Sequence, residues 1–178
     1  MVAAAVLPMP DVLVTTYLHM TSKAQFQPAF VNLSGITIER MQTPDVKFYR
    51  FLYDSVGEAW RWRDRRLMTD DELCAAIADP NVSVHVLYVG GTPAGYVELS
   101  KSGGETEIAY FGLRPNFMGM GLGKHLLSYG IDQAWRDGAK RLFVHTCNLD
   151  SPVALSNYRK RGFQVYQELR QPMPQRYC

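Results

Sequence analysis

Cysteine is scarce in this chain, which has three among its 178 residues: Cys74, Cys147 and Cys178. So sparse and odd-numbered a set does not suit a disulfide framework, and we expect a protein of the reducing cytoplasm. The three cysteines and the four histidines also show no spacing typical of a zinc site. We therefore expect no metal.

An excess of charge of one sign is also missing. The chain has 19 Lys and Arg against 17 Asp and Glu, a formal net charge of +2, which does not predict a nucleic-acid partner. No apolar run approaches the roughly 20 residues that a membrane span needs. The apolar start, MVAAAVLPMP, has no basic leading segment, so we predict neither a signal peptide nor a membrane partner.

The composition that is present is typical of a folded domain. Hydrophobic residues make up 47% of the chain and charged residues 20%, as in ordinary globular proteins. The length suits a single sizeable core. We expect residues 1–11 to form a flexible arm and residues 12–178 to form a single domain.

The spacing of apolar residues predicts two strands, two helices, a three-strand meander, and then helix, strand, helix and strand. The expected strands cover residues 12–20, 36–42, 82–90, 92–100, 105–113, 140–147 and 163–169. The expected helices cover residues 43–60 and 69–80, the segment from Leu122 to Gly138, and residues 151–162. Their caps are expected at Thr43, Thr69 and Ser151, the first and last followed by proline.

This order of elements predicts an α+β fold with a mixed, mostly antiparallel central sheet flanked by helices. Residues 82–113 are expected to form antiparallel neighbours. Residues 105–147 have the length of a right-handed parallel crossover. The strand over residues 12–20 would pair either within this sheet or across a homodimer.

A glycine-rich loop, FMGMGLGKH (residues 117–125), lies between an expected strand and an expected helix. Glycines let the backbone approach a ligand closely, and a helix N-terminus attracts anions, so the loop is a candidate phosphate site. The nucleoside-triphosphatase loop requires glycine where Met118 lies and a hydroxyl where His125 lies. The dinucleotide fingerprint requires G-x-G-x-x-G, whereas this loop reads G-x-G-x-G. Both mismatches argue against a nucleotide-binding protein.

The stretch LRPNFMGMGLGKHLL resembles the acetyl-CoA loop of the GNAT superfamily of N-acetyltransferases, [QR]-x-x-G-x-[GA] after a strand that ends V-x-P. Residues 113–115 match the end of that strand, and Gly121 and Gly123 match the two small positions. Met118 stands where the family usually has Arg or Gln, which favours a grip made mostly by backbone amides.

A second motif supports the resemblance. The stretch SPVALSNYRKRGF is similar to the family pattern N-x-x-A-x-x-x-Y-x-x-x-G-F. Four positions match in register: Ala154, Tyr158, Gly162 and Phe163. Ser151 takes the place of the usual Asn, and Asn148 precedes it by three residues. The resemblance covers roughly residues 36–170.

The resemblance implies an enzyme that transfers the acetyl group of acetyl-CoA to a primary amine directly, in a ternary complex. The alternative is a catalytically silent acyl-CoA-binding module of the same fold. The acceptor, a small molecule or a peptide, stays open. The implied cofactor contacts are Phe111, Leu113, Met118, Gly119, Met120, Gly121, Leu122, Gly123, Lys124, Asn148, Ser151 and Tyr158.

The resemblance also implies catalytic roles. Tyr158 matches the family's usual general acid, against the simpler interpretation that its ring only packs on the sheet. Glu107 aligns with a glutamate base, and Glu98 on the neighbouring strand is the second candidate; strand glutamates also commonly just face water. The strand around Phe111 and Leu113 is expected to part from the strand over 140–147 and to pair with the pantetheine arm.

The segment EAWRWRDRR (58–66) is expected to wall the acceptor site, with Trp60 and Trp62 as substrate-binding residues. Its arginines would meet solvent, acidic partners or a substrate carboxylate. His145 and Cys147 could form a nucleophilic pair on one strand. Direct transfer needs neither, so packing is the favoured interpretation of these two.

Overall fold

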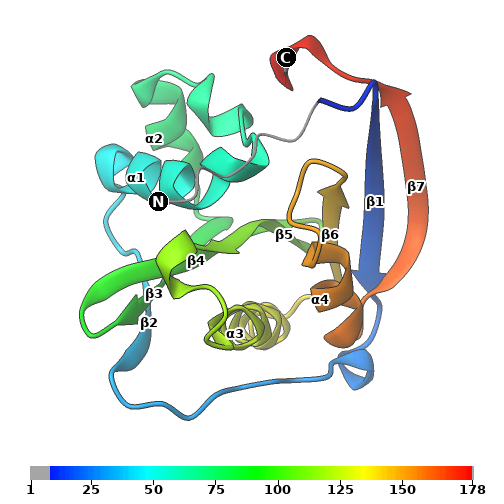
Figure 1. Cartoon of the computed structure of the whole chain (residues 1–178). Coiled ribbons are helices and arrows are strands. Elements are labelled where there is room, and N and C mark those ends of the chain that lie inside the picture. The colour runs from blue at the N-terminus through cyan, green and yellow to red at the C-terminus, as the bar shows by residue number, and fades with distance from the viewer. Residues whose placement is uncertain (1–8, 178) are drawn as a thin grey trace.

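A seven-stranded sheet, in the order β2-β3-β4-β5-β6-β1-β7, organises the structure, a computed structural model that describes residues 9–177 (Figure 1). Its strands are β1 Val12–Met20, β2 Ile36–Arg40, β3 Val82–Val89, β4 Thr92–Ser102, β5 Glu105–Leu113, β6 Arg141–Cys147 and β7 Gln164–Pro172. The helices are α1 Val46–Gly57, α2 Asp70–Ala78, α3 Leu122–Arg136 and α4 Ala154–Lys160. Short 3-10 turns are η1 Lys23–Gln25, η2 Glu58–Trp60, η3 Asp64–Arg66, η4 Pro115–Phe117 and η5 Gln175–Tyr177.

The pairing confirms the predicted fold class, a mixed and mostly antiparallel sheet in an α+β domain. Only β5 and β6 run parallel, joined by α3, while the other neighbouring strands in the described part of the chain are antiparallel. The first strand pairs within the sheet: β1 lies between β6 and β7. A homodimer stays a prediction. Most of the arm expected over residues 1–11 lies outside the described residues.

Two helix starts differ from the sequence prediction. Asp45, not Thr43, caps α1, because its side chain accepts a hydrogen bond from the Phe48 amide. α4 begins at Ala154 after an uncapped turn, so Ser151 is not its cap. In both cases the proline lies before the helix and not at its first position. Thr69 caps α2 as predicted, in a capping box with Glu72.

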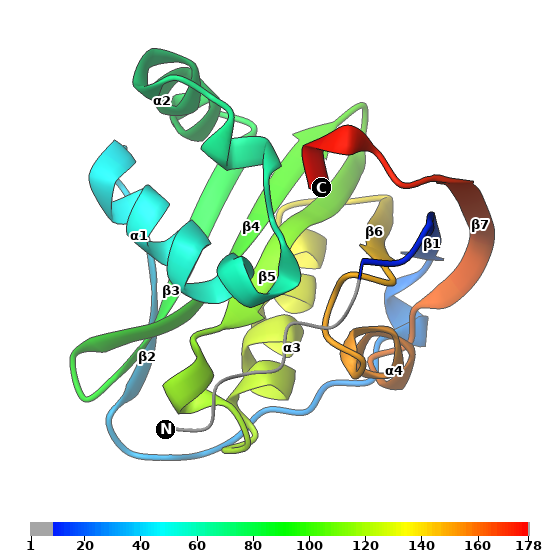
Figure 2. The same ribbon diagram turned by 45° about the horizontal axis from the view of Figure 1, so that its top comes forward.

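Helices cover both faces of the sheet, and Figures 1 and 2 show α1 and α2 on one face and α3 and α4 on the other. Each face has its own buried cluster, because alternate strand residues point to opposite faces. Val84, Val86 and Tyr96 pack with α1 and α2. Val97 and Leu99 pack with α3. The sheet therefore holds two separate cores.

The connection between β1 and β2 crosses the whole width of the sheet, because these strands lie at distant positions in it (Figure 1). Side chains of α3 bind its backbone on the way. Ser128 Oγ accepts a hydrogen bond from the Ala29 amide at 2.9 Å, and His125 Nδ1 accepts one from the Val31 amide at 3.2 Å. His125, at the hydroxyl position of a triphosphatase loop, thus serves the fold.

Gly162 lies where this connection approaches the end of α4. Its φ is +104°, and an added Cβ would lie 1.9 Å from the carbonyl oxygen of Gln25. We expect Gly162→Ala to lower the free energy of unfolding by about 3 kcal/mol, because strain and a backbone clash add. Gly138, with φ +86° and nothing within 4 Å, is the matched control; its Ala variant should lose about 1 kcal/mol. Equal losses in urea denaturation would contradict the clash.

Candidate active site

β5 and β6 separate after a short parallel ladder. Their pairing covers only residues 105–107 and 141–143, although β5 continues to Leu113 and β6 to Cys147. Beyond the ladder, the facing edges of the two strands have no partner in each other. The parting of strands that the resemblance implied is therefore present. It leaves backbone N–H and C=O groups of β5 available to an extended, amide-bearing ligand.

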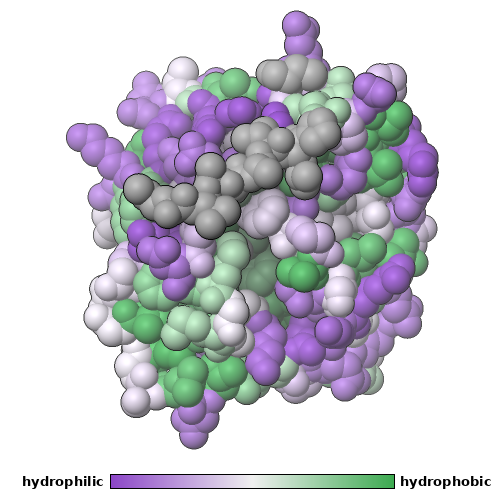
Figure 3. Space-filling view, viewed as in Figure 1, coloured by the Kyte–Doolittle hydropathy of each residue, from purple (hydrophilic) through white to green (hydrophobic). Residues whose placement is uncertain are grey.

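A cavity of about 520 Å³ opens at this gap. Its walls come from many segments: the β5 segment 108–113, the end of α1, the α1–α2 linker, the glycine loop, the end of β6, the start of α4, β1, β7 and η5. Figure 3 shows a hollow near the centre of one face, with hydrophobic residues inside it and a rim of mixed hydropathy. The volume suits a small-molecule site.

The glycine loop forms one wall of the cavity. Gly119 and Gly121 both have positive φ, 80° and 74°, and Gly121 stands at the N-terminus of α3, which no side chain caps. A Cβ added at Gly119 would meet nothing within 4 Å, and one at Gly123 only Leu113, at 3.7 Å. The glycines therefore leave open space next to free helix-start amides, where an anion is stabilised by the helix dipole.

Most of the residues that the resemblance assigns to the cofactor line this cavity: Phe111, Leu113, Met118, Gly119, Gly121, Gly123, Lys124, Ser151 and Tyr158. Three do not. Met120 points to solvent and Leu122 is fully buried in the core. Asn148 accepts a hydrogen bond from the Val14 amide and donates one to the Val12 carbonyl, so its side chain holds the start of β1. Asn157 lines the cavity and was missed by the sequence analysis.

Tyr158 reaches the cavity from α4 with a largely buried ring. The ring packs edge-on against Phe111 and Phe163. Burial raises the pKa of its phenol well above the ordinary value, so the hydroxyl keeps its proton at neutral pH. It has no hydrogen-bond partner among residues 9–177. A protonated, unengaged phenol in a cavity wall suits a proton donor.

His145 on β6 also lines the cavity and is paired with Glu107 on β5. Its Nδ1 lies 3.2 Å from Glu107 Oε1. The hydrogen bond to Glu107 raises the His145 pKa above 6.5, and the carboxylates of Asp150 and Asp64 act in the same direction. Glu107 itself is not a cavity-lining residue. The carboxylate therefore orients the imidazole, and the imidazole faces the cavity.

Sequence reasoning placed His145 at the cleft but did not find this pair. The available signal was the parallel crossover, which puts Glu107 opposite Phe143, two residues before His145. The nucleophilic pair gains no support, because burial raises the pKa of the Cys147 thiol to about 11. A thiol with so high a pKa is a poor nucleophile at neutral pH.

Glu98, the second candidate base, lies outside the cavity and is fully buried. One carboxylate oxygen accepts a hydrogen bond from the Tyr49 hydroxyl at 2.5 Å, and the other from the Arg65 guanidinium at 2.5 Å. Arg65 also lies over the ring of Tyr110. These contacts give Glu98 a structural task, which is to hold Arg65 and with it the α1–α2 linker.

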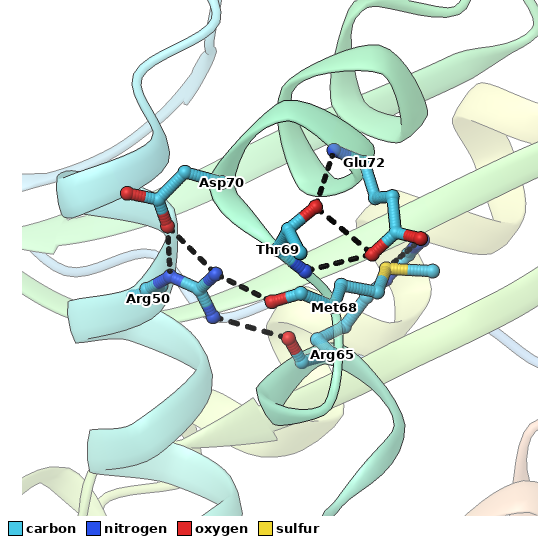
Figure 4. Close-up of polar contacts among 6 residues, drawn as sticks. All are labelled: Arg50, Arg65, Met68, Thr69, Asp70 and Glu72. Carbon is cyan, nitrogen blue, oxygen red and sulfur yellow. Dashed lines mark hydrogen bonds and ion pairs between the residues drawn. The ribbon is translucent and has the colours of Figure 1, made fainter.

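Arg50 of α1 also binds this linker (Figure 4). Its guanidinium donates to the carbonyl oxygens of Arg65 and Met68 and to the carboxylate of Asp70. Arg50 thus holds the linker backbone within η3 and just after it, although the linker has no regular secondary structure beyond single turns. These contacts fix the position of the linker at the cavity.

Trp60 and Trp62 lie on this linker and line the cavity, as expected for an acceptor wall. Trp62 packs against Tyr53 and Tyr110, each with ring centroids 5.3 Å away. Its indole N–H points to Asp150, which also accepts hydrogen bonds from the Thr146 hydroxyl and the Cys147 amide. Asp150, another residue that the sequence analysis missed, joins the linker to the end of β6.

Comparison with known proteins decides the family. The family model described as "Acetyltransferase (GNAT) family" matches residues 48–163, more than half of the chain. The chain belongs to the GNAT acetyltransferase family. The resemblance stated from the two motifs is confirmed.

A curated relative of this GNAT chain is the N-alpha-acetyltransferase RimI of Mycobacterium tuberculosis (strain ATCC 25618 / H37Rv). The two are 39% identical over 90 residues, which cover 46% of this chain and 54% of the relative. The chain thus spans about half the length of that curated relative.

Solved structures share the GNAT fold. A GCN5-related N-acetyltransferase from Sphaerobacter thermophilus has a TM-score of 0.67 at 19% identity, over 92% of this chain and 52% of that one. PaiA N-acetyltransferase from Thermoplasma acidophilum, solved with coenzyme A, has a TM-score of 0.56 at 15% identity, over 77% and 99%. Similar structures also include acetyltransferases named for aminoglycosides and for a ribosomal protein, so acceptors differ widely within this fold.

The GNAT family uses acyl-CoA, and the cavity fits such a ligand. The glycine loop offers the anion cradle for a pyrophosphate, and the unpaired edge of β5 offers partners for an amide-bearing arm. Within residues 9–177, no group of three or more His, Cys, Asp or Glu is placed to hold a metal ion. In the same part of the chain, no helix combines the length and the apolar character that crossing a membrane requires.

Proposed function

We propose that this protein is an N-acetyltransferase that uses acetyl-CoA and transfers its acetyl group directly to a primary amine. The observation that supports this most is the meeting of three features in one cavity. These are the parted edge of β5, the uncapped glycine loop before α3, and the side chains of Tyr158 and His145. The sparse cysteines agree with a cytoplasmic setting.

The acyl donor, when bound, supplies an activated acetyl thioester. The neutral form of His145 takes a proton from the acceptor amine, directly or through a water, and Glu107 holds the ring in the required orientation. In this mechanism a backbone amide near Phe111 polarises the carbonyl oxygen. Tyr158, whose phenol lines the cavity, delivers its phenolic proton to the leaving thiolate. The base assigned to Glu107 from the sequence thus becomes a His145–Glu107 pair.

The acceptor we favour is a small amine or the amino terminus of a peptide. The similarity to an N-alpha-acetyltransferase supports the peptide amino terminus. The alternative, a silent acyl-CoA-binding module, gains no specific support, because Tyr158 and His145 both line the cavity.

An assay of thiol release tests the proposal. The protein is mixed with acetyl-CoA and a panel of amines, and free coenzyme A is measured. Acceptor-dependent release is the expected result. If coenzyme A binds but no acceptor causes its release from acetyl-CoA, the silent module is favoured. If coenzyme A does not bind at all, the proposal is wrong.

Replacing Tyr158 by phenylalanine separates the acid role from packing. The ring contacts with Phe111 and Phe163 are kept, while the proton is lost. We expect kcat to fall about 100-fold with little change in coenzyme A affinity, measured by calorimetry. An unchanged kcat would remove Tyr158 from the acid role.

A further inference from the structure

The α1–α2 linker carries four arginines, and the structure divides them into two pairs. Arg65 and Arg66 point away from the cavity and are neutralised by Glu98 and Asp54 respectively. Arg61 and Arg63 line the cavity instead. The four arginines, alike in the sequence, therefore lie in two environments: two are ion-paired outside the cavity and two line it.

Neither cavity-lining arginine has a carboxylate partner among residues 9–177. The Arg61 guanidinium makes only a long hydrogen bond, 3.5 Å, to the carbonyl oxygen of Tyr177. Arg63 has no hydrogen bond or ion pair from its side chain in the same part of the chain. Two guanidinium groups therefore line the cavity without an ion-pair partner in the described part of the chain.

The acidic groups at this end of the cavity are already engaged. Asp64 pairs with Arg176 at 3.6 Å. Asp150 accepts hydrogen bonds from Trp62, from the Thr146 hydroxyl and from the backbone. Three arginines line this end of the cavity against the two carboxylates of Asp64 and Asp150, so the wall around Trp60 and Trp62 keeps a net positive charge.

This charge lies away from the anion cradle of the glycine loop. η5 packs against the linker through the Arg176–Asp64 and Arg61–Tyr177 contacts. Figures 1 and 2 both place η5 beside the linker and away from α3. The two arginines are therefore placed to meet the acceptor rather than the phosphates of the acyl donor.

The backbone conformation of Arg61 also suggests a ligand-binding position. Its φ of 57° is the one positive value for a non-glycine residue among those the structure describes. Such strained positions persist where the surroundings demand them, and they gather at ligand sites.

We propose that the acceptor amine carries a carboxylate close to the amino group, and that Arg61 and Arg63 bind this carboxylate. The planar guanidinium fork matches a carboxylate, and each charge-assisted hydrogen bond is stronger than a neutral one. Free α-amino acids and peptides with an acidic residue next to the amino terminus share this chemistry. The inference rests on the proposed acetyltransferase function and names the substrate class of that site.

Matched acceptor pairs test it in the thiol-release assay. One arm compares free amino acids with their amides, and the other compares peptides with Asp or Asn at the second position. We expect the carboxylate member of a pair to have a kcat/KM at least about tenfold higher, the effect of one charge-assisted contact. A preference in the first arm alone identifies free amino acids, and in the second arm alone acidic peptides; both outcomes support the proposal.

Variants locate the effect. Arg61→Gln and Arg63→Gln should each reduce the preference, and the double variant should bring the ratio close to one. Arg66→Gln, on the same linker but paired with Asp54 outside the cavity, should keep the wild-type ratio. A wild-type ratio near one in both arms, or a ratio that survives in the double variant, would overturn the proposal. So would a large loss of coenzyme A affinity in these variants, because the arginines would then serve the acyl donor.

Calorimetry separates this inference from the proposed function. The same acceptor pairs are titrated into the protein loaded with coenzyme A. If no acceptor turns over but the carboxylate member binds at least tenfold tighter, the transferase proposal fails and the carboxylate site stands. Equal binding of the two members, with or without turnover, overturns the carboxylate site.

Discussion

Replacing His145 by glutamine is expected to lower kcat by about 10²- to 10⁴-fold, the usual contribution of a positioned general base. Glutamine keeps much of the size of the imidazole and can still hydrogen-bond to Glu107, so the fold should survive. His19→Gln is the matched control. His19 lies on β1, stacks on Tyr166 of β7 and does not line the cavity. A kcat within twofold of wild type for His145→Gln would remove His145 from the reaction.

The pH dependence offers a second readout of the same pair. A histidine base works when neutral, so kcat/KM should fall as the pH drops through the His145 pKa, which lies above 6.5 because Glu107 accepts its hydrogen bond. Glu107→Gln removes that stabilisation of the protonated ring and lowers the pKa. The acidic limb of the profile should therefore move to lower pH. A limb that stays in place would show that Glu107 does not tune His145.

Replacing Glu98 by glutamine is expected to lower the free energy of unfolding by about 3–5 kcal/mol. The carboxylate is fully buried, and its removal leaves the mostly buried Arg65 guanidinium without its counter-charge. Urea denaturation measures the loss. Asp54→Asn is the control, since its ion pair with Arg66 is about half exposed and should contribute less than about 1 kcal/mol.

The double variant Glu98→Gln with Arg65→Met distinguishes a buried charge from a simple packing defect. Removing both charges should recover part of the lost stability, because no uncompensated cation stays in the core. The KM for the acceptor should rise more than kcat falls in Glu98→Gln, since Arg65 anchors the linker that carries Trp60 and Trp62. A loss below about 1 kcal/mol, or a pure kcat effect, would contradict the anchoring role.

The fold was largely predictable from the sequence. Alternation and turn residues located the strands to within a few positions, and β5 matches its predicted range of 105–113. The errors lie at helix starts, where Pro44 and Pro152 suggested first helical residues but both helices begin two residues later. Local geometry at a helix start depends on which side chain reaches the free amides, as Asp45 does for Phe48.

The candidate site was predictable where a local motif carries it. The glycine loop and Tyr158 have fixed spacings, so the sequence alone could name them and the family. Contacts between distant segments had no such signal. The Glu107–His145 pair joins two strands, and the Glu98–Arg65 ion pair joins residues 33 positions apart.

The sequence by itself determined the elements, their order and the two motifs, because these depend on spacing along the chain. Only the tertiary structure decided that β1 inserts between β6 and β7, that Glu98 is an anchor, and that two of the four linker arginines face the cavity. The physical reason is that burial and charge pairing depend on which segments meet across the sheet. One carboxylate became structural because an arginine was packed against it, and another came to orient a histidine because two parallel strands part just beyond it.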